Sequence, residues 1–324
     1  MALRNRSILG LTLVGSMLLA GCDAMFQPVD RPADRPDTAQ ISAPPSAASA
    51  ELASYFNRVQ MGLLEQGLLR TDGGGPDTPF DADDLVRDFL RIAFYEEYAD
   101  TGSQLVARQN ASRMHRWEKP VTLSVEFGAS ISPADRTRKE NIVRHYVQRL
   151  ARVSGHPIRF VSDSSASNFH VLFANEDERR LLGPRLKQIM PNISRTALNT
   201  VINLPRSTYC LAFATDPQFD GTYDQAIAVI RSEHPDLLST SCVHEELAQG
   251  MGLSNDSPLA RPSIFNDDEE FGYLTTHDEL LLKMLYDPRL KPGMDEAEAR
   301  PIVEQIADEL MVRLTCKGGR HGHS

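Results

Sequence analysis

The residues most able to do chemistry lie in one short acidic segment. Glu245 and Gln249 are four residues apart and therefore share one face of a helix, with Glu246 beside them. Asn255 and Asp256 add an amide and a carboxylate a few residues later. Carboxylate and amide oxygens suit calcium, magnesium or manganese, and a carboxylate can accept a proton from water. The alternative is a solvated helix face followed by a turn.

This segment resembles the HExxHxxGxxH motif of the metzincins, a subgroup of the zincin metallopeptidases. In that motif three histidines hold zinc and the glutamate activates water. With His244 as first ligand, the second position falls on Ala248, so this register fails. With Glu245 in that position, the second ligand is Gln249 and the third is Asn255. Glu246 then takes the place of the base.

The ligands that this second register implies are mostly oxygen atoms, with Asp256 adding one more nearby. The resemblance therefore implies a divalent metal (zinc, manganese or calcium) or no metal at all. His244 is an additional ligand if the helix register shifts. The alternative for His244 is an ordinary surface or packed residue.

The downstream sequence carries the resemblance further. Ser263-Ile264-Phe265 resembles the Ser-Ile-Met of the metzincin Met-turn, and residues 274–286 resemble the helix that closes the domain. The run from Glu-Glu-Leu-Ala-Gln to Tyr-Asp-Pro is most similar to DUF2927, a family of uncharacterised bacterial proteins that is grouped with zincin-like peptidases. The chain is identified as a member of that family.

The N-terminus has the pattern of a lipoprotein signal peptide. Arg4 and Arg6 precede the apolar stretch Ile8–Leu19, which is too short to span a bilayer. Leu-Ala-Gly then precedes Cys22, which we expect to be lipidated. The alternative is a chance cysteine beside an ordinary signal peptide. The pattern predicts a periplasm-facing envelope protein held to a membrane by its lipid.

The cysteines favour one disulfide. An exported protein meets an oxidising compartment. Cys210 lies in a predicted strand and Cys242 in a predicted helix, and we expect this pair to form a bond that leaves Cys316 over. The alternative is three buried thiols.

Hydrophobic periodicity predicts an α+β fold with a zincin-like, three-layer domain. The predicted helices cover residues 50–69, 81–98, 132–154, 177–190, 237–251, 276–286 and 295–314. The predicted strands cover residues 120–127, 158–161, 169–173, 208–214 and 226–230. We expect a signal peptide (1–21), a disordered tether (22–50), a helix pair (51–111), the metzincin-like domain (112–290) and a C-terminal helix with a tail (291–324).

Two further features have plain interpretations. The acidic run 266–270 lacks the glycine of a calcium-binding EF-hand loop, so we expect a solvated turn. His277, in the first turn of a helix, is expected at the surface. The formal charge of −10 and the absence of a basic stripe argue against nucleic-acid binding.

These observations leave two principal functions open. One is a divergent metallopeptidase of the envelope. The other is a catalytically inactive pseudoenzyme that binds an envelope protein, a peptide or peptidoglycan. A calcium-stabilised structural lipoprotein is a third.

Overall fold

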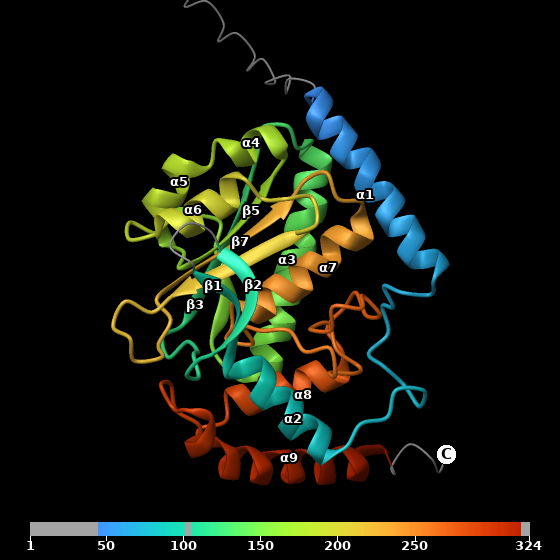
Figure 1. The fold of residues 1–324 in the computed structure, drawn as a ribbon, viewed down its shortest axis with the longest axis vertical. Helices are drawn as coiled ribbons and strands as arrows, with labels where there is room; N and C mark the ends of the chain where they lie inside the picture. Colours follow the sequence, from blue (N-terminus) through green and yellow to red (C-terminus); the bar gives the residue numbers. More distant parts are fainter. Residues whose placement is uncertain (1–44, 101–104, 319–324) are drawn as a thin grey trace, which may run out of the picture. The chain divides into compact units, whose positions relative to one another are not determined.

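The computed structural model describes residues 45–100 and 105–318 of the chain. Its central sheet has five strands in the order β4-β3-β5-β7-β6. Figure 1 labels three of them, β3, β5 and β7. Four of the five strands run parallel: β3 (Val121–Phe127), β4 (Ile158–Phe160), β5 (Phe169–Ala174) and β7 (Gln225–Arg231). The fifth, β6 (Cys210–Thr215), is an antiparallel edge strand. The chain is a mixed α+β protein.

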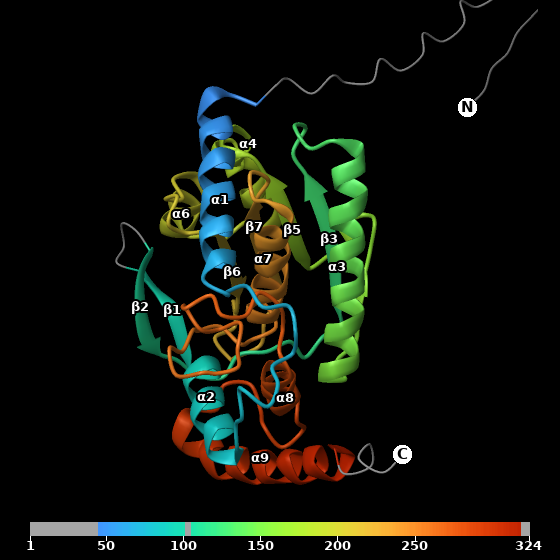
Figure 2. The same cartoon turned by 90° about the vertical axis from the view of Figure 1, so that its right-hand side faces the viewer.

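Helices cover both faces of this sheet. Every residue of β5 is buried, as expected for a strand with covered faces. One face packs on α5 (Gly183–Ile189) and α6 (Arg195–Ile202). The other packs on α3 (Pro133–Ser154) and α7 (Asp236–Gln249). Figure 2 shows α6 and α3 on opposite sides of the sheet.

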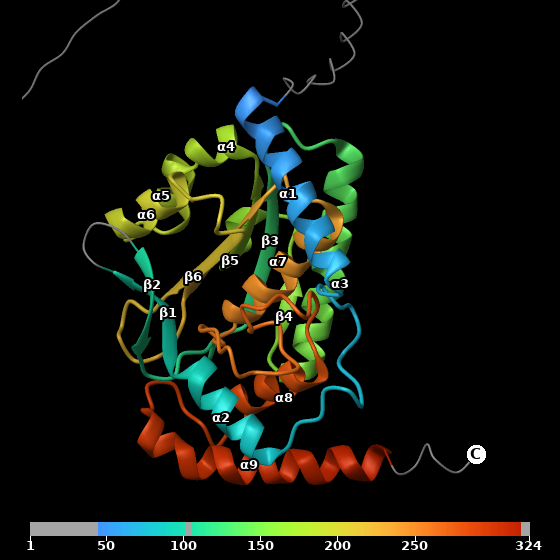
Figure 3. The ribbon, with the colours of Figure 1, turned by 45° about the vertical axis from the view of Figure 1, so that its right-hand side comes forward.

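The N-terminal region contains a hairpin that the sequence did not reveal. The helices are α1 (Ala47–Glu65) and α2 (Ala82–Ala93). The prediction that the second helix continues to residue 98 was wrong, because the chain turns at Phe94 into β1 (Tyr95–Asp100), which pairs with β2 (Leu105–Ala111). Figure 3 shows this hairpin next to β6.

The C-terminal helices complete the main core. α8 (Thr276–Leu285) and α9 (Glu296–Gly318) contact each other, and both contact α2. The larger hydrophobic cluster joins side chains of these three helices to the sheet and to α7. Within the part of the chain that the structure describes, no helix is long and apolar enough to cross a bilayer.

Two other local predictions were wrong. The helix predicted over residues 177–190 is divided into α4 (Glu176–Arg180) and α5, because Pro184 lacks the N–H that a continuous helix would bond to the carbonyl of Arg180. His277 is fully buried rather than at the surface. It lies between the carboxylates of Asp88, on α2, and Asp278.

Candidate functional site

Helix α7 carries the acidic segment and is fixed closely against the sheet. A side chain at Gly250 would collide with the ring of Phe169, and the Gly250 carbonyl accepts a hydrogen bond of 2.8 Å from Trp117. Gly252 has a φ of 119° and its Cα faces the carbonyl of His115, so this turn requires glycine. The end of α7 and the residues after it therefore have a defined position.

A disulfide joins this helix to the edge strand. It links Cys210, the first residue of β6, to Cys242 on α7, which is the pair that the sequence favours. The remaining described cysteine, Cys316, is free and exposed. The bond therefore holds the start of β6 against α7 at Cys242, which precedes Glu245 by three residues.

The carboxylates of Glu245 and Glu246 lie together beside this disulfide. An oxygen of each and the sulfur of Cys210 all lie within 4.8 Å of one another. Glu246 is buried and accepts a hydrogen bond from the Ala212 N–H of β6. Its Oε2 atom is buried with no hydrogen-bond partner among the described residues. An unpaired, buried carboxylate oxygen is costly, so it indicates a missing proton or cation.

Asp256 extends this pair of carboxylates. It is buried, and one of its oxygens accepts a 3.3 Å hydrogen bond from the Gln249 amide. Burial raises the pKa of Glu245, Glu246 and Asp256 well above the usual values, and the charges of neighbouring carboxylates raise each pKa further. These three residues are therefore brought together as the sequence predicts.

Three acidic residues outside the motif also belong to the site. Glu97, on β1, is the strongest charge that raises the pKa of both Glu246 and Asp256. Asp267 and Glu269 come from the run that the sequence indicates as a solvated turn, yet Glu269 is partly buried, and this burial raises its pKa to about 7. We call the six residues the carboxylate cluster: Glu97, Glu245, Glu246, Asp256, Asp267 and Glu269.

His244 makes contacts unlike those of a metal ligand. Its Nδ1 atom accepts a 3.0 Å hydrogen bond from the Leu274 N–H, and its ring stacks on Tyr146 with centroids 4.0 Å apart. Burial lowers the pKa of this buried imidazole to about 3, so it is neutral. One ring nitrogen of His244 is therefore occupied by a hydrogen bond, and the sulfur of Cys210 is occupied by the disulfide.

Asn255 connects the site to α2. Its amide donates hydrogen bonds to the carbonyls of Arg91 (2.9 Å) and Asp256 (2.8 Å), and its Oδ1 atom is buried with no partner among the described residues. The atoms available to bind a metal ion at this site are therefore carboxylate and amide oxygens. This set does not fit zinc, which prefers nitrogen and sulfur, and suits a hard cation better.

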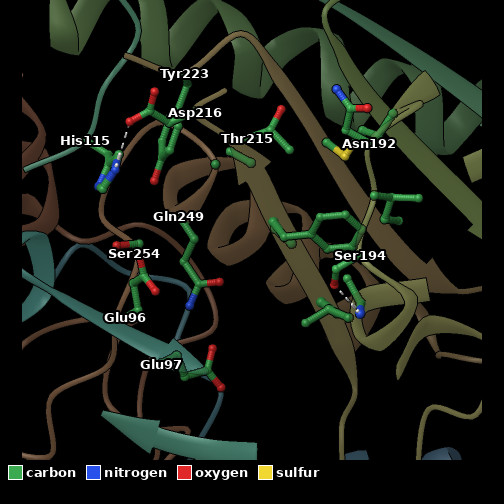
Figure 4. A pocket seen from close by; sticks show the side chains of 18 of the residues that line it. Glu96, Glu97, His115, Asn192, Ser194, Thr215, Asp216, Tyr223, Gln249 and Ser254 are labelled. Carbon is green, nitrogen blue, oxygen red and sulfur yellow. Dashed lines mark hydrogen bonds and ion pairs between the residues drawn. The ribbon is translucent and has the colours of Figure 1, made fainter. Parts of the chain in front are cut away.

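A pocket of about 490 Å³ opens beside the carboxylate cluster. All five residues from Leu211 to Thr215 line it, so it follows β6 along its length. Figure 4 shows Gln249 extending into the pocket toward Glu97. At another part of the wall, His115 and Asp216 form an ion pair of 3.4 Å. The pocket therefore joins a strand edge to an acidic surface.

Comparison with known proteins gives the chain a family. No curated protein matches it. One family model matches residues 82–305, which include the sheet, α7 and the carboxylate cluster, and its description is "Protein of unknown function (DUF2927)". Since this match covers more than half of the sequence, the chain belongs to the DUF2927 family.

Proposed function

We propose that this protein is a lipid-anchored component of the bacterial envelope that binds an extended polypeptide along β6. Its domain would be zincin-like in fold, without the ligand set for zinc. The observation that carries the proposal is the pocket, which follows an edge strand and reaches Gln249 and the carboxylate cluster.

The edge of β6 offers hydrogen bonds to a further strand. Among the described strands, β6 pairs with β7 alone. The Ala212 N–H points away from β7, because it donates to Glu246. In an antiparallel ladder alternate residues face the same side, so the Ala214 N–H and carbonyl face the pocket side as well. An extended peptide can add to such an edge through its main chain.

The acidic wall favours a basic side chain in that peptide. Glu97 lines the pocket, and its charge raises the pKa of both Glu246 and Asp256 behind it, because like charges are held close together. A lysine or arginine side chain placed here would reverse this repulsion and become desolvated at the same time. We therefore expect a peptide with a basic residue to bind more tightly than an acidic peptide of the same length.

The resemblance to zincins supports a binding site at the motif-bearing helix, beside an edge strand. The residues that replace the zinc ligands argue against zinc-dependent hydrolysis of peptides. The three imidazoles of the motif are replaced by Glu245, Gln249 and Asn255. The imidazole of His244 is stacked on Tyr146 and hydrogen-bonded to Leu274, and that of His115 is paired with Asp216. These features favour a binding protein over a zinc peptidase.

A second candidate is hydrolysis supported by a hard divalent cation. The specific observation in its favour is the unpartnered Oε2 atom of Glu246 within a group of buried carboxylates. Glu245, Gln249 and Asp256 are the residues that would hold such a cation, which would polarise a peptide carbonyl when bound. Glu246 would then accept a proton from water.

Peptide binding tests the main proposal. Fluorescence anisotropy would measure the affinity of the full chain for labelled, lysine-containing peptides and for acidic peptides of equal length. Ala214→Pro removes the N–H on the open edge, where proline is tolerated, whereas Ala214→Val keeps it. We expect the proline variant to lose about tenfold in affinity, roughly one net hydrogen bond, and the valine variant to retain binding. Equal binding by the two variants would refute strand addition.

The anchor requires a separate test, because Cys22 lies outside the described residues. Radiolabelled palmitate should be incorporated into the wild-type protein and into Cys316→Ala, but not into Cys22→Ala. The Cys22→Ala protein should leave the membrane fraction. Labelling that survives this substitution would contradict the proposed anchor.

A further inference from the structure

A second pocket, of about 290 Å³, lies where the parallel strands end. Asn175 and Ser232, directly after β5 and β7, line it together with Ser130, which lies three residues after β3. The chain leaves β3 through α3 toward β4 on one side, while β5 lies on the other side of β3. Such a switch in strand order opens a crevice at the carboxyl edge of a sheet, and ligands commonly bind there.

One wall of this pocket carries a buried cation. Lys139, on α3, is only 6% exposed, and its ammonium donates one hydrogen bond, of 2.7 Å, to Ser239. Its Nζ atom also lies 5.1 Å from the centre of the Phe173 ring. Lys139 forms no ion pair with any carboxylate of the described residues. An ammonium has three N–H donors, so this one is left with capacity for an anionic group.

The opposite charge comes from the segment after β7. Glu233 is 7% exposed, and its Oε1 atom accepts hydrogen bonds from the Ser49 hydroxyl (2.7 Å) and the Glu176 N–H (2.6 Å). Its Oε2 atom is buried with no partner among the described residues. The neighbouring His234 also lines the pocket, and its Nε2 atom is buried and unpartnered. This wall therefore has capacity for a hydrogen-bond donor.

The other charged side chains that line the pocket, Arg138 and Asp135, are already paired. Arg138 forms ion pairs with Asp135 at 2.8 Å and with Asp236 at 2.7 Å. Lys139 and Glu233 consequently remain as two opposite charges on separate walls, each lacking a partner for part of its hydrogen-bonding capacity. A ligand that satisfies both must carry an anionic group and a cationic donor within a small volume.

We propose that this pocket binds a small zwitterion of the α-amino acid class, with its carboxylate on Lys139 and its ammonium on Glu233. The site uses different residues from the β6 pocket, so it does not depend on peptide binding there. The first turn of α1 forms part of the wall through Ser49. Occupation of the pocket should therefore also hold α1 in place.

Calorimetry and thermal melting of the full chain test this proposal, with glycine, L-alanine and D-alanine as probes. Ethylamine and acetate each supply one half of the zwitterion, and phosphate supplies an anion alone. We expect at least one amino acid to bind saturably and to raise the melting temperature, and each half-ligand to bind about tenfold more weakly or less. Binding of phosphate or acetate as tight as that of the amino acids would overturn the zwitterion assignment.

Variants locate the site. Lys139→Met and Glu233→Gln should each weaken amino-acid binding about tenfold or more, while Lys187→Met, at an exposed lysine of α5, should not. If the pocket variants fail to fold, the wild-type protein still gives an answer. Amino acids should then protect Lys139 from acetylation by acetic anhydride, as measured by mass spectrometry of peptides. Failure of all the amino acids to bind or to protect Lys139 would refute the proposal.

Discussion

Glu246 of α7 accepts a hydrogen bond from the main-chain N–H of Ala212 on β6, while its second carboxylate oxygen is buried without a partner among the described residues. One side chain therefore connects the helix to the edge strand and also carries an uncompensated polar atom. Burial raises its pKa first, and the charges of Glu97 and Asp256 raise it further. This arrangement makes stability depend on pH.

Glu246→Gln should stabilise the folded protein at alkaline pH. In the unfolded chain, Glu246 loses its proton near the ordinary glutamate pKa of about 4.3. Because its pKa in the folded protein is raised, the folded protein keeps this proton to a higher pH. Stability therefore falls as pH rises above the pKa of the unfolded chain. The amide keeps an acceptor for Ala212 without the charge, so we expect a gain of about 1–2 kcal/mol at pH 8 and little change at pH 4.

Urea unfolding of wild type and variant at the two pH values measures this difference. Glu51→Gln, on the exposed side of α1, is the matched control and should change stability little at either pH. A Glu246→Gln variant that is less stable than wild type at pH 8 would mean that the ionised carboxylate is stabilised in the folded protein.

The disulfide supports a prediction on both stability and binding. Replacing Cys210 and Cys242 together by alanine removes a cross-link between residues 32 positions apart. We expect a loss of about 2–4 kcal/mol, because the unfolded chain gains freedom. Peptide affinity should fall as well, since β6 is no longer fixed to α7.

Thermal melting with and without dithiothreitol provides the measurement. The Cys316→Ala variant keeps the bond and should respond to the reductant as wild type does, because Cys316 is free and exposed. Unchanged peptide binding in the double alanine variant would show that the position of β6 does not depend on the cross-link.

The contact between His277 and Asp88 gives the protein a second loss of stability with rising pH, in the range where histidine rather than glutamate titrates. Both side chains are fully buried, and Nε2 of the histidine lies 3.2 Å from Oδ2 of the aspartate, an ion-pair contact without the alignment of a hydrogen bond. Burial alone lowers the pKa of His277, but the nearby Asp278 and Asp88 outweigh it and raise the net pKa. The resulting stabilisation is present below the unfolded pKa and is lost as pH rises through the folded pKa.

Asp88→Asn should therefore destabilise the protein by about 3–5 kcal/mol near pH 6 and by less at higher pH. Asp83→Asn, at an exposed position of the same helix, is the control. Denaturant midpoints at pH 6 and pH 9 would record the difference. An equal loss at both values would indicate that the charge of His277 has no part in holding α2 against α8.

His277 also illustrates where the sequence ceases to be informative. Hydrophobic spacing was sufficient to locate β3, α3, β5, β7, α7 and α8, because each pattern is local. The burial of His277 depends on Asp88, which lies 189 positions away in the numbering of the chain. The capping residues around it indicate a helix start, and a helix start is usually exposed. Packing of α2 on α8 reverses that expectation.

The candidate site was predictable in its centre and not at its margins. The four-residue spacing of Glu245 and Gln249 brings them to one face of α7, near Asp256. Glu97 was missed because its segment has apolar spacing that continues from α2 and therefore predicted helix. Asp267 and Glu269 were missed because a run of charges usually marks a solvated turn. Their proximity to the site depends on how the loop after α7 folds.

Peptide binding should not depend on a metal ion. The donors at the site are oxygen atoms, and His244 uses Nδ1 to hold Leu274, so we expect no stoichiometric zinc after dialysis against zinc salts. Removing divalent ions with a chelator should leave peptide affinity and melting temperature unchanged. Mass spectrometry of the metal content, with the Glu245→Ala/Gln249→Ala variant as control, makes the comparison. Zinc that is bound by wild type and lost in this variant would contradict the proposed zinc-free site. A rise in the melting temperature on adding calcium or manganese would favour the cation-dependent hydrolase instead. At a hundredfold excess of the cation over its dissociation constant, the expected gain in stability is about 2.7 kcal/mol.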